Sequence, residues 1–202
     1  MADFNVFEMM LFTLWIYLPG FLVNTFAMMW GKWLPKTGYG PWPIDGGRMH
    51  KDGNRLLGDG KTWNGLIGGS LTSGLLCYLM TMVPENWIFI SPTEAATGWA
   101  ASAFVLGTFL GFTSLVGDST GSYFKRRKGM KREGDVSSKA PLLDTLPFAI
   151  SVFVFGQLFL TGSNHGDRDL ILPMALLVVI TPILHRSFNL IGYKIGWKDV
   201  PY

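Results

Sequence analysis

The chain has 202 residues, of which 49% are hydrophobic and only 15% are charged. A charged share this far below the roughly 25% of soluble domains excludes an ordinary water-soluble domain and indicates a membrane protein. The net charge of +3 excludes little, whereas the single cysteine, Cys77, excludes an internal disulfide and a cysteine-based metal cluster.

Five apolar blocks have lengths close to the about 20 residues with which a helix crosses a bilayer. They cover about residues 4–29, 64–83, 95–116, 142–160 and 170–184. We therefore predict an all-α integral membrane protein with five transmembrane helices, forming a single polytopic domain over residues 1–202. Pro19 and Gly20 interrupt the first block, which predicts a kink or two half-helices there.

The basic residues are distributed very unevenly between the segments that join these blocks. Of 17 Lys and Arg residues, six lie from Lys32 to Lys61, seven from Lys125 to Lys139, and three after the last block, which leaves only Arg168 elsewhere. The positive-inside rule then predicts an outside N-terminus, a cytoplasmic C-terminus and two long cytoplasmic loops. We expect a multi-pass protein of the cell membrane whose site faces the cytoplasm.

The first basic loop ends in a glycine-rich segment directly before the second apolar block. This segment includes Arg55, Asp59, Gly60, Lys61 and Thr62. Glycines let the backbone approach a ligand, and the free N–H groups of a helix start attract phosphate, so the segment suits phosphate binding. It lacks the first glycine of a P-loop, and Lys61 also suits an anchor for lipid head groups.

The second basic loop is flanked by two acids, Asp118 and Asp144. We expect Asp118 at the C-terminus of the third span, where it opposes the helix dipole unless a cation or metal neutralises it. Asp144 lies in the apolar start of the fourth span, where an ionisable group suggests function. If the two helix ends touch, the two carboxylates suit Mg²⁺. The alternative pairs each acid with a cation from the loop between them, and the spacing leaves both interpretations open.

The basic run between these acids starts with Lys125, Arg126 and Arg127 and continues to Lys131. Such a run commonly binds anionic lipid, and it also suits a clamp for phosphates that gain charge as they leave. Nucleic acid is not expected, because the chain carries no recognisable binding module and these side chains share the membrane surface.

Three segments together resemble the archaeal CDP-archaeol synthases, which share a superfamily with the phosphatidate cytidylyltransferases. They read Arg55-Leu56-Leu57-Gly58-Asp59-Gly60-Lys61-Thr62-Trp63, then Gly117-Asp118-Ser119-Thr120-Gly121-Ser122 with Lys125-Arg126-Arg127, and finally Pro141-Leu142-Leu143-Asp144. The resemblance implies a cytidylyltransferase of archaeal phospholipid biosynthesis that requires Mg²⁺. CTP and 2,3-bis-O-(geranylgeranyl)-sn-glycerol 1-phosphate would give CDP-archaeol and pyrophosphate.

The resemblance also implies roles for particular residues. Asp118, Asp144 and Lys61 would be catalytic, and the two acids would bind the metal. The nucleotide and its phosphates would be bound by Arg55, Asp59, Gly60, Lys61, Thr62, Ser119, Lys125, Arg126, Arg127 and Lys131. The expected partners are CTP, an isoprenoid ether lipid phosphate and the bilayer, and an oligomer is possible.

One position departs from the family pattern, because Pro147 stands where a second acid is common. We expect Pro147 in the first turn of a helix that begins near Asp144. Two other functions fit the pattern of spans: a phosphatidate cytidylyltransferase acting on ester lipids, or a non-catalytic lipid-binding or transport protein. An ion relay for transport would place acids near mid-bilayer, whereas here they cluster at one edge.

Overall fold

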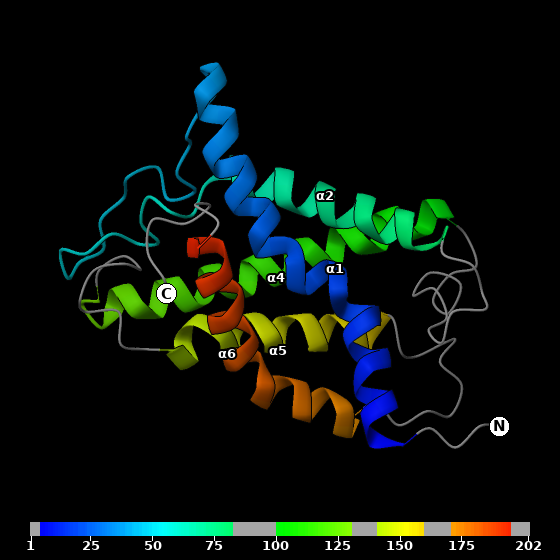
Figure 1. The fold of residues 1–202 in the computed structure, drawn as a ribbon. Coiled ribbons are helices and arrows are strands. Elements are labelled where there is room, and N and C mark those ends of the chain that lie inside the picture. Colours follow the sequence, from blue (N-terminus) through cyan, green and yellow to red (C-terminus); the bar gives the residue numbers. More distant parts are fainter. Residues whose placement is uncertain (1–4, 83–99, 131–140, 160–170, 195–202) are drawn as a thin grey trace.

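The computed structural model describes residues 5–82, 100–130, 141–159 and 171–194 (Figure 1). These residues form the helices α1 Val6–Trp33, η1 Leu34–Thr37 (a short 3₁₀ helix), α2 Trp63–Met80, α4 Ala100–Arg127, α5 Pro141–Phe159 and α6 Ile171–Lys194. Within the described ranges, β pairing is limited to two isolated bridges in the segment between α1 and α2. The predicted all-α class is confirmed.

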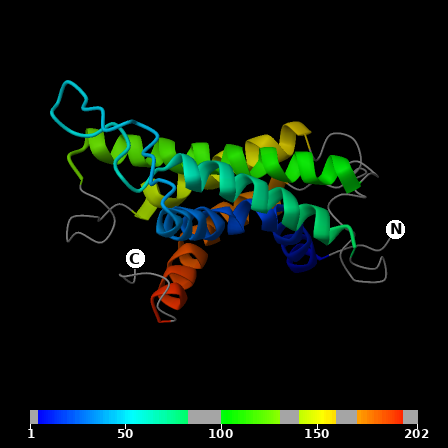
Figure 2. The same ribbon diagram turned by 90° about the horizontal axis from the view of Figure 1, so that it is seen from above.

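The helices α2, α4 and α5 lie side by side with α4 in the middle, and α1 crosses this layer (Figures 1 and 2). Neighbouring helices of the layer run in opposite directions, so the start of α2, the end of α4 and the start of α5 lie at the same end of the bundle. The segment between α1 and α2, drawn in cyan, covers this end. The segment between α1 and α2 and the helical turns that carry Asp118 and Asp144 therefore lie at the same end of the bundle.

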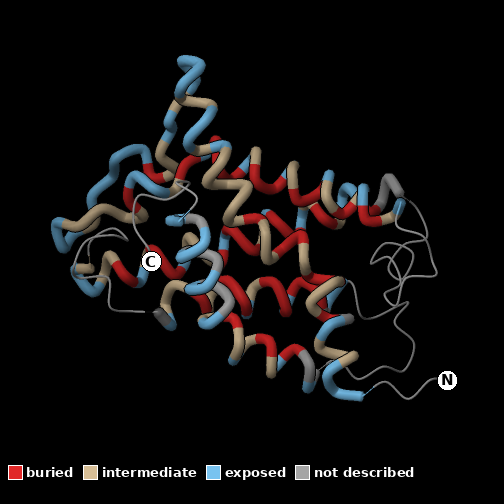
Figure 3. The backbone as a smooth tube through the Cα atoms, in the orientation of Figure 1, coloured by how far each residue is buried: buried red, intermediate tan, exposed pale blue. Residues whose placement is uncertain are grey.

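The core of the layer is built from small residues. A Cβ atom added to Gly69 of α2 would lie 3.0 Å from the Cβ of Ala27 in α1, and one added to Gly74 would lie 2.1 Å from the hydroxyl oxygen of Thr108 in α4. The opposite face of α2 is apolar and exposed, with Trp63, Ile67, Leu71, Leu75 and Leu79 at every fourth position (Figure 3). Small residues inside and large apolar residues outside are typical of helices packed within lipid.

Length and composition single out two of the described helices as able to cross a membrane. They are Val6–Thr37 and Ala103–Arg127, while Leu142–Gly156 and Met174–Ile183 are shorter apolar stretches. The number of five spans and their orientation therefore remain predictions.

The helix α1 is continuous through Pro19 and does not divide into two half-helices. Figure 1 shows its axis bending near the middle, in line with the expected kink. Neighbouring helices supply hydroxyl groups at this point, because Ser73 of α2 donates to the carbonyl of Pro19 at 2.9 Å and Ser114 of α4 donates to that of Gly20 at 3.1 Å. The carbonyl groups of Pro19 and Gly20 thus accept hydrogen bonds from neighbouring helices inside the bundle.

Two of the expected helix boundaries that bear on the site were wrong. The helix α4 does not end near Val116 but continues to Arg127, so Asp118 lies inside a helix and not at its C-terminus. Hydropathy falls at Gly117 because two glycines, Gly117 and Gly121, pack against α5 and polar residues lie between them, and this change does not interrupt the helix. The helix α5 begins at Pro141, so Pro147 lies beyond the first turn. The last helix likewise continues past residue 184, to Lys194.

Candidate active site

The helices α4 and α5 approach closely at two glycines of α4. A Cβ atom on Gly121 would lie 2.3 Å from the carbonyl oxygen of Leu143, and one on Gly117 would lie 2.5 Å from that of Pro147. Proline has no N–H group, so the Leu143 carbonyl lacks its usual helical donor at this point of closest approach. Larger residues at either glycine would force the two helices apart.

This crossing determines where the two predicted acids lie. Asp118 precedes Gly121 by three residues, a rise of roughly 4.5 Å along α4, and Asp144 directly follows Leu143. Both carboxylates therefore start within one helical turn of the same contact. The sequence left open whether two neighbouring helix ends would bring these acids together. In the structure Asp144 does lie at a helix start, whereas Asp118 lies inside α4, and both are close to the point where the two helices cross.

Each acid forms an ion pair with a lysine of another helix or loop. Lys61, just before α2, pairs with Asp118 of α4, and Lys125 of α4 pairs with Asp144 of α5. All four side chains are largely buried, from 9% exposure for Lys125 to 26% for Lys61. Two lysines and two carboxylates from the segment before α2, from α4 and from α5 thus form two ion pairs, and their charges balance.

The surrounding backbone favours this charge arrangement. Asp144 lies in the first turn of α5, where the positive end of the helix dipole stabilises a carboxylate. Lys125 lies in the last turn of α4, where the negative end of the dipole stabilises an ammonium group. The pairing of Asp144 with a cation from the second basic segment was one of the two alternatives left open by the sequence, whereas the pairing of Asp118 with Lys61 was not foreseen.

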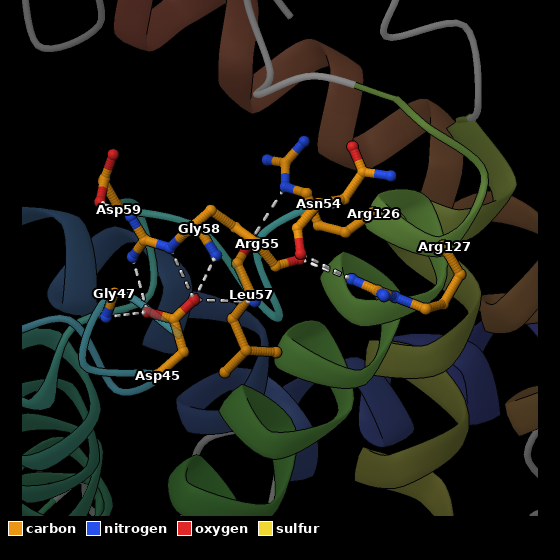
Figure 4. A network of polar contacts seen from close by, with 9 residues as sticks. All are labelled: Asp45, Gly47, Asn54, Arg55, Leu57, Gly58, Asp59, Arg126 and Arg127. Atoms are coloured by element: carbon orange, nitrogen blue, oxygen red, sulfur yellow. Dashed lines mark hydrogen bonds and ion pairs between the residues drawn. The ribbon is translucent and has the colours of Figure 1, made fainter. Parts of the chain in front are cut away.

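The segment that carries Lys61, residues 45–61, is organised around the buried carboxylate of Asp45 (Figure 4). We call this segment the Lys61 loop. Arg55 donates to Asp45 through Nε at 3.2 Å and Nη2 at 2.6 Å, and the backbone N–H groups of Leu57 and Gly58 each donate at 3.0 Å. Gly47 adds a fifth hydrogen bond at 3.1 Å.

These contacts control the ionisation of Asp45. Burial disfavours its charged form, but the Arg55 guanidinium and the N–H groups of Leu57, Gly58 and Gly47 outweigh that effect and hold the pKa of Asp45 well below its usual range. In return, the hydrogen bonds that Arg55 donates to Asp45 raise the pKa of Arg55, and its hydrogen bond to Asp59 adds to the effect. Both groups therefore stay charged at neutral pH.

Two arginines of α4 attach this loop to the helix that bears Asp118. Arg126 donates from Nε to the carbonyl of Leu57 at 3.4 Å, and Arg127 donates from Nη2 to that of Arg55 at 2.6 Å. Arg127 also donates to Asp52 at 2.8 Å. Figure 4 shows both side chains reaching from α4 to the loop backbone. The sequence predicted phosphate contacts for these arginines, and in the structure they hold the loop.

The remaining predicted binding residues lie in different surroundings. Thr62 caps α2, since its hydroxyl accepts from the N–H of Gly65 at 3.1 Å. Asp59 accepts from Arg55 at 2.7 Å, and its side chain is 71% exposed. Ser119 lines a mostly apolar cavity of about 310 Å³ beside the Lys61 loop. Gly60 lies in a turn ahead of α2, and Lys131 lies outside the described residues.

Sequence reasoning assigned Asp45 no place in the site. Its signal was present, because an acid stands between an apolar residue and two glycines in Pro43-Ile44-Asp45-Gly46-Gly47. Such a turn-rich acid is usually exposed, however, and only the fold shows that the carboxylate is buried beneath Arg55.

The carboxylates of the site are the groups that could bind a divalent metal ion. Among the described residues, no group of three or more His, Cys, Asp and Glu side chains is arranged to hold a metal. The protein would therefore supply two carboxylates, Asp118 and Asp144, beside the helix crossing. Mg²⁺ is usually bound by one or two carboxylates and completes its coordination with water and substrate phosphate, so this donor set fits Mg²⁺.

Comparisons with known proteins agree with these features. The family model of CarS-like CDP-archaeol synthases matches residues 6–202. The chain is 36% identical to the CDP-archaeol synthase of Thermococcus gammatolerans, over 96% of both chains, and 36% identical to that of Methanosarcina barkeri, over 92% of this chain and 99% of the relative. It is also similar to a solved structure of an intramembrane enzyme for archaeal membrane lipids biosynthesis, with 26% identity, a TM-score of 0.54, and coverage of 83% of this chain and 91% of that chain.

Proposed function

The chain belongs to the CDP-archaeol synthase family, and from this we propose that it catalyses the cytidylylation of a lipid phosphate. CTP and 2,3-bis-O-(geranylgeranyl)-sn-glycerol 1-phosphate react to give CDP-archaeol and pyrophosphate. The observation that carries the proposal is the alternation of Lys61, Asp118, Lys125 and Asp144 where the Lys61 loop and helices α4 and α5 meet.

The reaction displaces pyrophosphate from the α-phosphorus of CTP. An oxygen of the lipid phosphate forms the new bond to this phosphorus, and the bond from the phosphorus to the bridging oxygen of pyrophosphate breaks. A phosphate monoester is largely a dianion at neutral pH, since its second pKa is about 6, so the nucleophile needs no strong general base. Catalysis then depends on positioning and on stabilising the charge of the leaving group.

We assign this electrostatic role to the two lysines. Lys61 and Lys125 have flexible stems, and their ammonium groups already lie beside the carboxylates of the site. When CTP binds, they are in position to contact its phosphates and to stabilise the charge that develops on pyrophosphate. Gly60 and the start of α2 add backbone N–H groups next to Lys61.

Asp118 and Asp144 are the residues that we propose for Mg²⁺. When bound, the ion neutralises phosphate charge and orients the triphosphate. The carboxylates that now pair with lysines would provide its protein ligands. Pro147 gives this chain no further acid at the crossing, so two carboxylates are the complete protein set in this proposal.

The other predicted binding residues have a supporting place in the proposal. Arg55, Arg126 and Arg127 hold the Lys61 loop, and Thr62 caps α2 next to Lys61. We propose that they act on the phosphates through the position of the loop. Asp59, Ser119 and Lys131 stay predicted contacts of the nucleotide.

We further propose that residues 1–202 form one domain with five spans, an outside N-terminus and a site that faces the cytoplasm. Two observations support this orientation. Sixteen of the 17 basic residues fall in segments that this topology places on one side, and the ion pairs and the Lys61 loop gather at one end of the α2, α4 and α5 layer (Figure 1).

A transfer assay with purified protein in detergent tests the function. Radiolabelled CTP is supplied with Mg²⁺ or with EDTA, and with the geranylgeranyl ether phosphate, an ester phosphatidate or no lipid. We expect a labelled CDP-lipid only with Mg²⁺ and preferentially with the ether lipid. Equal conversion of the ester would assign the chain to the phosphatidate branch, and absence of any CDP-lipid would refute the proposal.

A further inference from the structure

We propose that Asp45 is a positioning residue, which sets the location of Lys61 relative to Asp118. The inference rests on the proposed function of Lys61 in binding phosphate. Asp45 itself cannot contact CTP in this arrangement, because its side chain is only 1% exposed. Its effect must therefore pass through the loop.

Hydrogen bonds connect the Asp45 region to both backbone groups of Lys61. On one side, Gly58 donates its N–H to the Asp45 carboxylate at 3.0 Å, and the Gly58 carbonyl accepts from the N–H of Lys61 at 3.3 Å. On the other side, the N–H of Ile44, the residue before Asp45, donates to the carbonyl of Lys61 at 2.9 Å. The backbone of Lys61 is thus held from two directions.

The same loop is fixed to α4 at Gly58. This glycine has φ of +94°, which side chains rarely tolerate, and an added Cβ would lie 3.2 Å from Nε of Arg126. Arg126 belongs to the helix that carries Asp118. The loop therefore positions Lys61 and its partner in one rigid frame.

The frame depends on the charge of Asp45. The Asp45 carboxylate is the acceptor in all five of its hydrogen bonds, and both of its oxygens accept. An asparagine would replace one oxygen by an NH₂ group that faces donors, so at least one contact with Arg55 or the loop backbone would be lost. Lys61 would then move, although its own side chain is unchanged.

A double-mutant cycle tests the inference through the kcat and KM for CTP and through CTP binding without lipid. We expect Asp45→Asn to lower kcat/KM about 100-fold, the size of effect produced by a small misplacement of a catalytic group. In a Lys61→Ala background, Asp45→Asn should lower kcat/KM by less than about threefold, because the Lys61 side chain that Asp45 positions is already absent. Losses that multiply in the double variant would overturn the inference.

Controls separate this inference from general stability and from the proposed function. Lys51→Ala changes an exposed side chain of the same loop to which no contact of the site is assigned, and should change kcat/KM by no more than about twofold. If Asp45→Asn does not fold, Arg55→Lys enters the same cycle, since one ammonium cannot reproduce the two contacts of Arg55 with Asp45. A wild-type protein without transfer activity refutes the proposed function, whereas an active Asp45→Asn variant refutes only the role of Asp45.

Discussion

Lys61 pairs with Asp118 across 57 positions of the sequence, and the pair connects the start of α2 with the interior of α4. Asp118 is 17% exposed and Lys61 is 26% exposed at the side chain. Removing either partner leaves the other charge partly buried and unpaired, which is more damaging than losing a surface ion pair. The pair therefore couples the geometry of the site to the packing of the bundle.

Replacement of Asp118 tests the carboxylate directly. We expect Asp118→Asn to lower transfer activity by more than about 100-fold, because it removes the charge that would hold the metal and pair with Lys61. The fold should stay intact, but the thermal unfolding midpoint should fall, because Lys61 is left partly buried without its partner. Activity within a few-fold of the wild type would remove Asp118 from the site.

The role of Lys61 can be tested against another lysine of the same loop, Lys51. Lys61→Ala should reduce CTP affinity and kcat/KM strongly, because a phosphate contact is lost. Lys51→Ala removes an exposed cation of the loop and should leave both values nearly unchanged. The two variants are compared by equilibrium dialysis with labelled CTP. Equal losses in both would indicate that Lys61 contributes only to the general positive charge of the loop.

The helix crossing makes a steric prediction. Gly121→Ala should destabilise the protein by about 1–3 kcal/mol, because the new Cβ would lie 2.3 Å from the Leu143 carbonyl oxygen. Transfer activity should fall with it, since α5 carries Asp144. Gly31→Ala is the matched control, as its Cβ would meet nothing closer than 3.6 Å. Unfolding midpoints in detergent compare the two, and an unaffected Gly121→Ala variant would contradict the described packing.

The lowered pKa of Asp45 predicts a specific dependence of stability on pH. A carboxyl whose pKa is depressed in the folded state stabilises fully above its unfolded pKa of about 3.9, and this contribution is lost as pH falls toward the folded value. The difference in stability between the wild type and Asp45→Asn should thus be largest above pH 5 and shrink as pH falls toward 3. Unfolding curves at several pH values measure it. A difference that grows on acidification would have the wrong sign.

Labelling of single cysteines tests the membrane orientation. Lys51→Cys places a thiol at an exposed position ahead of α2, and Glu85→Cys places one after the second predicted span, which covers residues 64–83, both in a Cys77→Ser background. In sealed vesicles, a membrane-impermeant maleimide should reach Glu85→Cys from the outside and Lys51→Cys only after permeabilisation. Labelling of both from the same side would contradict the predicted topology.

Composition and spacing predicted the all-α class, and the distribution of basic residues predicted that Lys61, Asp118 and Asp144 would lie on one side of the membrane. The end of α4 was not predictable from hydropathy, because helical hydrogen bonds continue through Gly117 and Gly121 while apolar character falls. The two glycines indicate that another helix packs closely against α4, but the sequence does not show which residues of which helix lie opposite them.

The internal contacts of the site were beyond sequence reasoning for the same reason. Arg126 and Arg127 belong to a run of cations that suits phosphate or lipid equally well, and only the fold brings them to the backbone of the Lys61 loop. Asp45 shows the converse case. The sequence assigned it no role, and yet it accepts five hydrogen bonds once Arg55 covers it.

The contacts of the Lys61 loop also bear on the order in which the protein is assembled during synthesis. Asp45 bonds to residues no more than 13 positions away, so its cluster involves only segments that leave the ribosome together. The pairs Lys61–Asp118 and Lys125–Asp144 must wait for α4 and then α5. Synthesis from the N-terminus can therefore prepare the loop first and complete the pattern of ion pairs only when α5 is in place.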